Sequence, residues 1–152
     1  MSVPSEFGVR ESELVELVVP NDLQSAKKLE DRILAELARC RYEPDVTFGI
    51  KLAFEEAVTN AVKHGNNNDA SKQLVVRYAV NPERTVIMVR DEGRGFSPAR
   101  IPDPTRDENL ERPRGRGIML MRAYMTRVHF NQAGNEVWLL KTNPRPGGPC
   151  SS

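Results

Sequence analysis

The sequence is poor in features that define several protein classes. Its 152 residues include two cysteines and one tryptophan, and no apolar run approaches the ~20 residues of a membrane span. Cys40 falls in a helical pattern and Cys150 lies in the last three residues, a placement that suggests neither a disulfide framework nor a metal cluster. Met1–Arg10 lacks the pattern of a signal peptide. We therefore expect a soluble, reduced, cytoplasmic protein with no membrane span.

A charge excess of either sign is also missing. The chain has 22 Lys and Arg against 21 Asp and Glu, for a net charge of +1, so no global field attracts nucleic acid or an anionic membrane. Neither a GxxxxGK[ST] loop nor a strand–GxGxxG–helix unit occurs. We expect no direct nucleic-acid partner, and any nucleotide site must be of another type.

The composition is that of one globular domain, with 39% hydrophobic and 28% charged residues. Apolar periodicity and turn residues predict a domain over residues 13–142, with flexible termini at 1–12 and 143–152. The proline- and charge-rich segment Ser97–Arg114 is predicted to be a long functional loop. The expected elements are a strand over Glu13–Val19, a helix from Asp22 to Cys40, a helix from Pro44 to His64, strands over Gln73–Val80 and Thr85–Arg90, a helix over Ile118–Met125, and strands over Arg127–Asn131 and Glu136–Thr142.

The second predicted helix carries a polar row. Glu56 and Asn60 are four residues apart and share one face, and Lys63 continues it. Such a row can present a carboxylate, an amide oxygen and a cation to one ligand, and Mg²⁺ accepts hard oxygen ligands of this kind. A solvated polar face is the alternative interpretation, because such rows are common on surface helices.

Two glycine-containing segments follow at element ends. Asp91 ends a strand before Gly93 and Gly95, where a carboxylate could accept a hydrogen bond from an exocyclic amine and glycines could admit a flat ligand. Arg114-Gly115-Arg116-Gly117 opens a helix, where free N–H groups and arginines favour phosphate. Taken singly, each segment could instead be an ordinary turn or hinge.

The order of these three motifs resembles one family. Glu56-Ala57-Val58-Thr59-Asn60-Ala61 with His64-Gly65, then Asp91-x-Gly93-x-Gly95-Phe96, then Gly115-x-Gly117-Ile118-x-Leu120-Met121 are similar to the three boxes of the GHKL ATPases. The residues of the first box are most similar to those of the anti-sigma-factor serine kinases. One departure is Asn135-Glu136, which stands where the family often has a small hydroxyl residue.

The resemblance implies an α+β fold of the Bergerat type: a two-layer sandwich with helices on one face of a mixed, mostly antiparallel sheet. It also implies ATP and Mg²⁺ as cofactors and a nucleotide lid over Ser97–Arg114. Its site roles are Glu56 as general base, Asn60 as magnesium ligand, Asp91 for adenine, Gly93 and Gly95 in the adenine pocket, and Gly115 and Gly117 near the phosphates. From the residues themselves we also expect Lys63, Arg114 and Arg116 at the bound nucleotide.

The function implied is an ATP-dependent protein serine/threonine kinase that acts as an anti-sigma factor. It would phosphorylate a small antagonist protein, bind a sigma factor and form a homodimer. The alternative is a non-catalytic, nucleotide-gated binding module, and Glu56 favours the kinase because binding alone needs no base. A detached histidine-kinase catalytic domain is disfavoured, since no helical phosphoacceptor segment is apparent.

Overall fold

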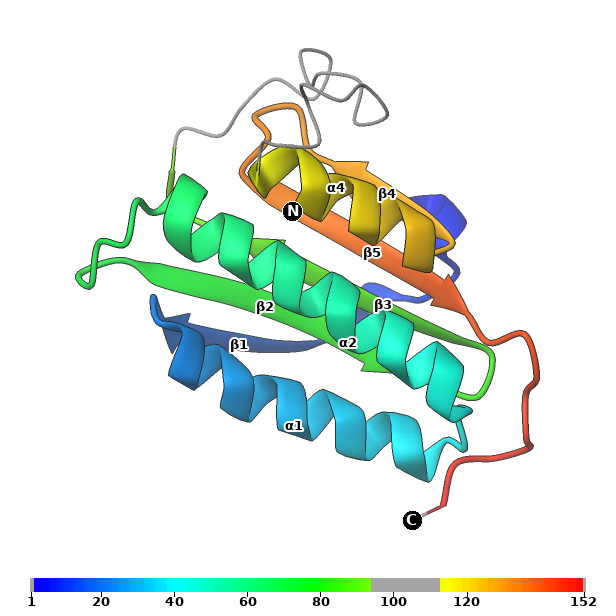
Figure 1. Ribbon diagram of the computed structural model, residues 1–152. Helices are drawn as coiled ribbons and strands as arrows, with labels where there is room; N and C mark the ends of the chain where they lie inside the picture. The colour runs from blue at the N-terminus through cyan, green and yellow to red at the C-terminus, as the bar shows by residue number, and fades with distance from the viewer. Residues whose placement is uncertain (1, 94–112, 152) are drawn as a thin grey trace.

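The structure is a computed structural model that describes residues 2–93 and 113–151. These residues form two layers, a five-stranded antiparallel sheet in the order β1-β2-β3-β5-β4 and helices that cover one of its faces (Figure 1). This confirms the expected fold class. The strands are β1 (Val15–Pro20), β2 (Gln73–Val80), β3 (Arg84–Arg90), β4 (Arg127–Phe130) and β5 (Glu136–Thr142).

The helical layer consists of α1 (Leu23–Arg39), α2 (Pro44–Thr59) and α4 (Pro113–Tyr124), with α2 between the other two (Figure 1). Local chemistry sets the starts of α1 and α2. Asp22 caps α1 by accepting a 2.7 Å hydrogen bond from the Ser25 backbone N–H, and Pro44 occupies the first turn of α2. The main core lies between the layers and includes Ile33, Leu37, Ile50, Phe54, Leu74, Val76, Ile87, Ile118 and Leu139.

The end of α2 changes its winding. The sequence predicts one helix up to His64, but from Asn60 to Gly65 the backbone is a π-helix, η3. The Asn66 N–H donates to the Ala61 carbonyl at 2.8 Å, a bond across five residues. Turns of this kind are rare and occur mostly at functional sites.

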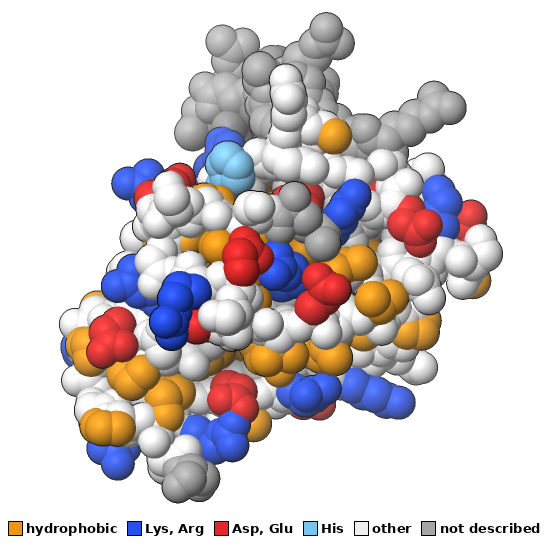
Figure 2. Space-filling view, turned by 180° about the vertical axis from the view of Figure 1, so that it is seen from behind, with side chains coloured by type: hydrophobic (Ala, Val, Ile, Leu, Met, Phe, Trp, Pro, Cys, Tyr) orange, Lys and Arg blue, Asp and Glu red, His pale blue; other side chains and the backbone are white. Residues whose placement is uncertain are grey.

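The opposite face of the sheet is partly covered by the N-terminal residues, which form two short 3₁₀ turns, η1 (Ser5–Phe7) and η2 (Glu11–Glu13). The sequence predicts that residues 1–12 form a flexible terminus. In the structure Phe7 is fully buried against Met88 and Trp138, and other apolar side chains show on this side of the molecule (Figure 2). A lone phenylalanine in a polar stretch forms no periodic pattern, so this contact could not be predicted from the sequence.

The C-terminal residues fold back over the turn between α1 and α2. Arg145 forms ion pairs with Glu43 and Asp45, each at 2.9 Å, and a disulfide joins Cys40 to Cys150. The expectation that the two cysteines form no disulfide is therefore wrong. The pair is 110 residues apart, and only the return of the chain end brings the two thiols together.

Within the described ranges, none of the helices combines the length and apolar character needed to cross a lipid bilayer.

Candidate functional site

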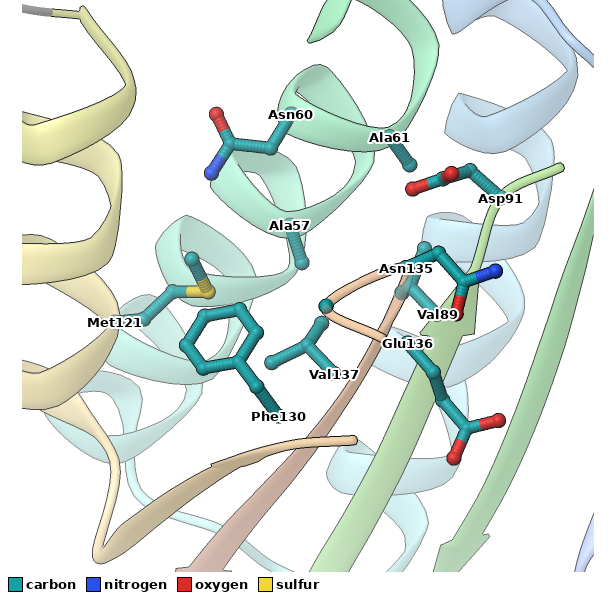
Figure 3. Close-up of a pocket in the computed structure, with 11 residues that line it drawn as sticks. Ala57, Asn60, Ala61, Val89, Asp91, Met121, Phe130, Asn135, Glu136 and Val137 are labelled. Atoms are coloured by element: carbon teal, nitrogen blue, oxygen red, sulfur yellow. The ribbon is translucent and has the colours of Figure 1, made fainter. Parts of the chain in front are cut away.

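A pocket opens where α2 and α4 meet the ends of β3 and β5 (Figure 3). Its cavity volume is about 20 Å³, roughly the space of one water. The enclosed part of the pocket is therefore smaller than a nucleobase. The described lining residues are Ala57, Asn60, Ala61, Val89, Asp91, Met121, Phe130, Gly134, Asn135, Glu136 and Val137.

Asp91 lies at the end of β3, is only 7% exposed, and lies beside Ala61 at the wall of the pocket (Figure 3). Its backbone N–H donates to the Asn135 carbonyl at 2.9 Å, and its Oδ1 accepts the Gly93 N–H at 2.7 Å. A Cβ on Gly65 would overlap the Asp91 carboxylate. The first and second motifs, far apart in sequence, are therefore in direct contact here.

Gly93 strengthens that contact. A Cβ at this position would overlap the carbonyl oxygen of Gly65, so both backbones approach closely because neither residue has a side chain. Asn135 reaches the same turn, and its Nδ2 donates to the Gly93 carbonyl at 3.4 Å. Asn135 is thus part of the pocket wall, although the sequence marks it only as a departure from the family.

The third motif packs on the first. Gly117 in α4 is buried, and a Cβ built on it would lie 2.9 Å from Oε2 of Glu56 and 3.3 Å from Nδ2 of Asn60. Glu56 and Asn60 are both partly exposed. The structure therefore brings three of the candidate residues into one cluster, with Asn60 also on the pocket wall.

For the other candidate residues, the structure shows no contact with this cluster among the described residues. Lys63 on η3 and Arg116 on α4 are exposed. Arg114 and Gly115 belong to the first turn of α4, and their contacts lie outside what is described. Gly95, together with residues 97–112 of the expected lid, also lies outside the described residues.

Glu136 has a different role from its neighbour. Its side chain points away from the pocket (Figure 3) and Oε2 accepts a 2.8 Å hydrogen bond from Nε1 of Trp138. Both side chains are buried. Alternation along β5 therefore explains why Val137 lines the pocket while Glu136 and Trp138 serve the other side of the sheet.

A second groove lies beside Glu56, between α1 and α2, with a volume of about 330 Å³. The sequence treats Glu30 as part of the polar face of α1, but it is only 2% exposed and lines this groove. Burial raises the pKa of Glu30, and a hydrogen bond with Glu55 raises it further. Burial opposes ionisation of Glu55 too, but hydrogen bonds with Glu30 and Lys51 outweigh it and lower the pKa of Glu55.

The oxygen donors near the pocket suit Mg²⁺ better than a metal held by protein side chains alone. Among the described residues, no group of three or more His, Cys, Asp and Glu side chains is arranged to hold an ion by itself. Mg²⁺ does not require such a group, because it keeps several waters and usually binds substrate phosphates plus one or two protein oxygens. The amide oxygen of Asn60, at the pocket wall, fits that kind of site.

Comparison with known proteins identifies the relationship. The family profile described as "Histidine kinase-like ATPase domain" matches residues 19–141. The anti-sigma F factor of Geobacillus thermodenitrificans is 38% identical over 67% of this chain and 73% of its own length. The serine-protein kinase RsbW of Bacillus subtilis is 27% identical over 86% of each chain.

Other relatives are matched over a smaller part. The chain spans 56% of the serine-protein kinase RsbW of Oceanobacillus iheyensis, with 31% identity. In three dimensions the chain is similar to the crystal structure of the RsbU and RsbW domains of a Mycobacterium tuberculosis protein. That match has a TM-score of 0.57 and 17% identity, and covers 91% of this chain and 34% of the other, which supports the fold. The chain belongs to the histidine kinase-like ATPase family, and within it is similar to an anti-sigma F factor.

Proposed function

We propose that this protein is an ATP-dependent protein serine/threonine kinase that acts as an anti-sigma factor in a partner-switching circuit. The observation that carries the proposal is the contact of Gly117 with Glu56 and Asn60 beside the pocket that contains Asp91. The Glu56 carboxylate, the Asn60 amide oxygen and the Asp91 carboxylate therefore lie in one region of the structure. Phosphoryl transfer needs groups of this kind for positioning and charge stabilisation.

Each residue has a distinct role in this proposal. Asp91 accepts a hydrogen bond from the exocyclic amine of adenine, and its burial strengthens that bond. Asn60 supplies an oxygen to Mg²⁺, which neutralises phosphate charge when bound. Glu56 accepts the proton of the incoming serine or threonine hydroxyl, or orients that hydroxyl for attack.

The remaining candidate residues line the adenine pocket or bind the phosphates. Gly93 and Gly95 line the adenine pocket. The start of α4 presents backbone N–H groups to the phosphates, and a glycine at 117 allows close approach. Positive charge near the phosphates comes from Lys63, Arg114 and Arg116.

We propose that the protein acts in the cytoplasm as a homodimer, phosphorylates a small antagonist protein and binds a sigma factor. The names of two similar proteins, an anti-sigma F factor and a serine-protein kinase, support the sigma factor and the phosphorylation. The disulfide is unusual for that compartment, where thiols are normally kept reduced. Nucleic acid and membrane are not expected partners.

The experiment that tests the kinase compares Glu56→Gln with Glu55→Gln. The two substitutions are chemically identical and fall on neighbouring residues of α2, but only Glu56 meets Gly117. With labelled ATP and the copurified antagonist, Glu56→Gln should reduce phosphotransfer by roughly 10²–10⁴-fold while ATP still binds. Glu55→Gln should retain most of the activity.

One outcome would contradict the kinase assignment, and another would contradict only the role of Glu56. Wild-type protein that binds Mg-ATP but labels no copurified partner would indicate a nucleotide-gated binding module instead of a kinase. A Glu56→Gln variant as active as the wild type would remove Glu56 from the mechanism while leaving the kinase assignment in place.

A further inference from the structure

Asn66, directly after the π-helix, is fully buried although asparagine is usually a surface residue. Its carboxamide hydrogen bonds in three directions. Nδ2 donates to Oδ1 of Asn21 at 2.9 Å and to the Gln73 carbonyl at 3.1 Å. Oδ1 accepts the Glu92 backbone N–H at 2.8 Å. A buried polar group with its donors and acceptor all engaged holds its neighbours in one arrangement.

The position of this network connects the first two motifs. Gly65 touches the side chain of Asp91, and the next residue, Asn66, holds the N–H of the residue after Asp91. Gly65 and Asn66, at the end of η3, therefore contact Asp91 and Glu92, which directly follow β3. Glu92 is held a second time, because its Oε2 accepts the Gln73 N–H at 2.6 Å.

We propose that Asn66 is a positioning residue for nucleobase recognition. Its carboxamide oxygen anchors the turn Asp91–Gly93 to the end of the helix, and this anchor fixes the direction of the Asp91 carboxylate at the pocket. Asn66 does not line the pocket itself. The inference rests on the proposed role of Asp91 in reading adenine.

A purely structural role makes a different prediction from a positioning role. Asn21 belongs to the same network, since its Oδ1 accepts from Asn66 and its Nδ2 donates to the Asp69 carbonyl at 3.0 Å. Asn21→Ala therefore weakens the network but leaves the bond from Asn66 to Glu92. Asn66→Ala removes that bond as well. Both variants lose stability, but only Asn66→Ala should change how the base is recognised.

The experiment compares ATP with ITP, in which a carbonyl oxygen replaces the exocyclic amine of adenine. Calorimetry on the full chain gives both dissociation constants. Wild-type protein should prefer ATP, since the carbonyl of ITP would face the Asp91 carboxylate. Asn66→Ala should reduce this preference by about tenfold, the scale of one disturbed buried hydrogen bond, mainly through weaker ATP binding. Asn21→Ala should keep the preference of the wild type.

The matched control is Asn67→Gly. Asn67 is exposed and has φ 52°, a conformation that glycine adopts readily, so this change removes a carboxamide one residue away without strain. It should leave both dissociation constants unchanged. If Asn66→Ala does not fold, Asn66→Ser replaces it, because a hydroxyl can still donate to Asn21 or Gln73 while the shorter side chain withdraws the oxygen from the Glu92 N–H. That variant should reduce the preference for ATP as Asn66→Ala does.

The outcomes separate the two proposals. If the wild type binds ATP and ITP equally, Asp91 does not read the amine, and the roles of both Asp91 and Asn66 are overturned. If the wild type prefers ATP and Asn66→Ala has the same preference, only the role of Asn66 is overturned. A folded Asn66→Ser protein with the wild-type preference would likewise refute the anchor through the carboxamide oxygen.

Discussion

Gly117 and Glu56 are neighbours across the interface of α4 and α2: a methyl group on the glycine would lie 2.9 Å from Oε2 of the carboxylate. The two residues are 61 positions apart in the chain. Their contact means that the side chain of Glu56 has its present position only because residue 117 has none. Gly117, in the third motif, thus leaves room for the carboxylate of Glu56 in the first motif.

The contact leads to a prediction for Gly117→Ala. The atom that must yield is the far end of a flexible side chain, and alanine favours a helix over glycine by up to about 1 kcal/mol. The variant should therefore fold with unchanged or higher stability. Phosphotransfer should nevertheless fall, by up to about 10²-fold if the carboxylate moves by 1 Å. Thermal unfolding and a labelled-ATP assay measure the two effects, and an active Gly117→Ala protein would show that the position of Glu56 is uncritical.

Asp91→Asn should weaken ATP binding without loss of the fold. The asparagine oxygen can still accept the Gly93 N–H, as Oδ1 of Asp91 does at 2.7 Å. The charge-assisted bond to the adenine amine is lost, which corresponds to about ten- to a hundredfold in affinity. Asp31→Asn, on the exposed side of α1, is the control that removes the same charge elsewhere. Equal ATP affinity of the Asp91 variant and the wild type in calorimetry would mean that the adenine site lies elsewhere.

Cys150→Ser should lower the free energy of unfolding. A disulfide across 110 residues restricts the unfolded chain, and the chain-entropy relation gives a stabilisation of about 4–5 kcal/mol for a loop of that size. Urea unfolding with and without a reducing agent measures it. Wild-type protein should lose stability in the reducing agent, while Cys150→Ser should be indifferent to it. A wild type whose midpoint ignores the reducing agent would contradict the bond.

Glu30→Gln should stabilise the protein at neutral pH. Burial raises the pKa of Glu30, so its ionised form is disfavoured in the folded state and costs stability at pH values above that pKa. Glutamine removes the buried charge and can still donate to Glu55. The gain should shrink as the pH falls through the pKa of Glu30 and the wild-type carboxyl becomes protonated.

Thermal unfolding against pH measures this difference. The control is Glu83→Gln in the exposed turn between β2 and β3, which should show no such pH-dependent gain. If Glu30→Gln is less stable than the wild type at neutral pH, the ion pair of Glu30 with Lys27 outweighs the cost of burial.

The sequence predicted the elements whose patterns are local. The bounds of β2 and β5 agree to the residue because β-rich runs end at clear turn residues. Contacts that depend on the return of the chain were missed: Phe7 on the far face of the sheet, the pairing of Cys40 with Cys150, and the burial of Asn66 in a segment that reads as a polar loop. None of these leaves a periodic signal.

In the candidate site, too, local patterns were predictable and long-range contacts were not. Motif order was enough to nominate Glu56, Asn60 and Asp91, because each stands at a predicted helix face or strand end. Their joint arrangement was not readable, since it depends on glycines that touch other motifs: Gly65 against Asp91 and Gly117 against Glu56. The π-helical winding after Asn60 also has no simple signature in the sequence.

The disulfide makes the oxidised chain a covalent ring with one long free arm and a two-residue tail. Residues 41–149 lie inside the ring and include α2, α4 and all the candidate site residues, whereas β1 and α1 form the arm. A protease that cuts once within 41–149 therefore leaves both pieces attached. Such nicked protein keeps its full mass in a non-reducing gel and separates into two fragments only after reduction, so the gel conditions decide whether cleavage is seen at all.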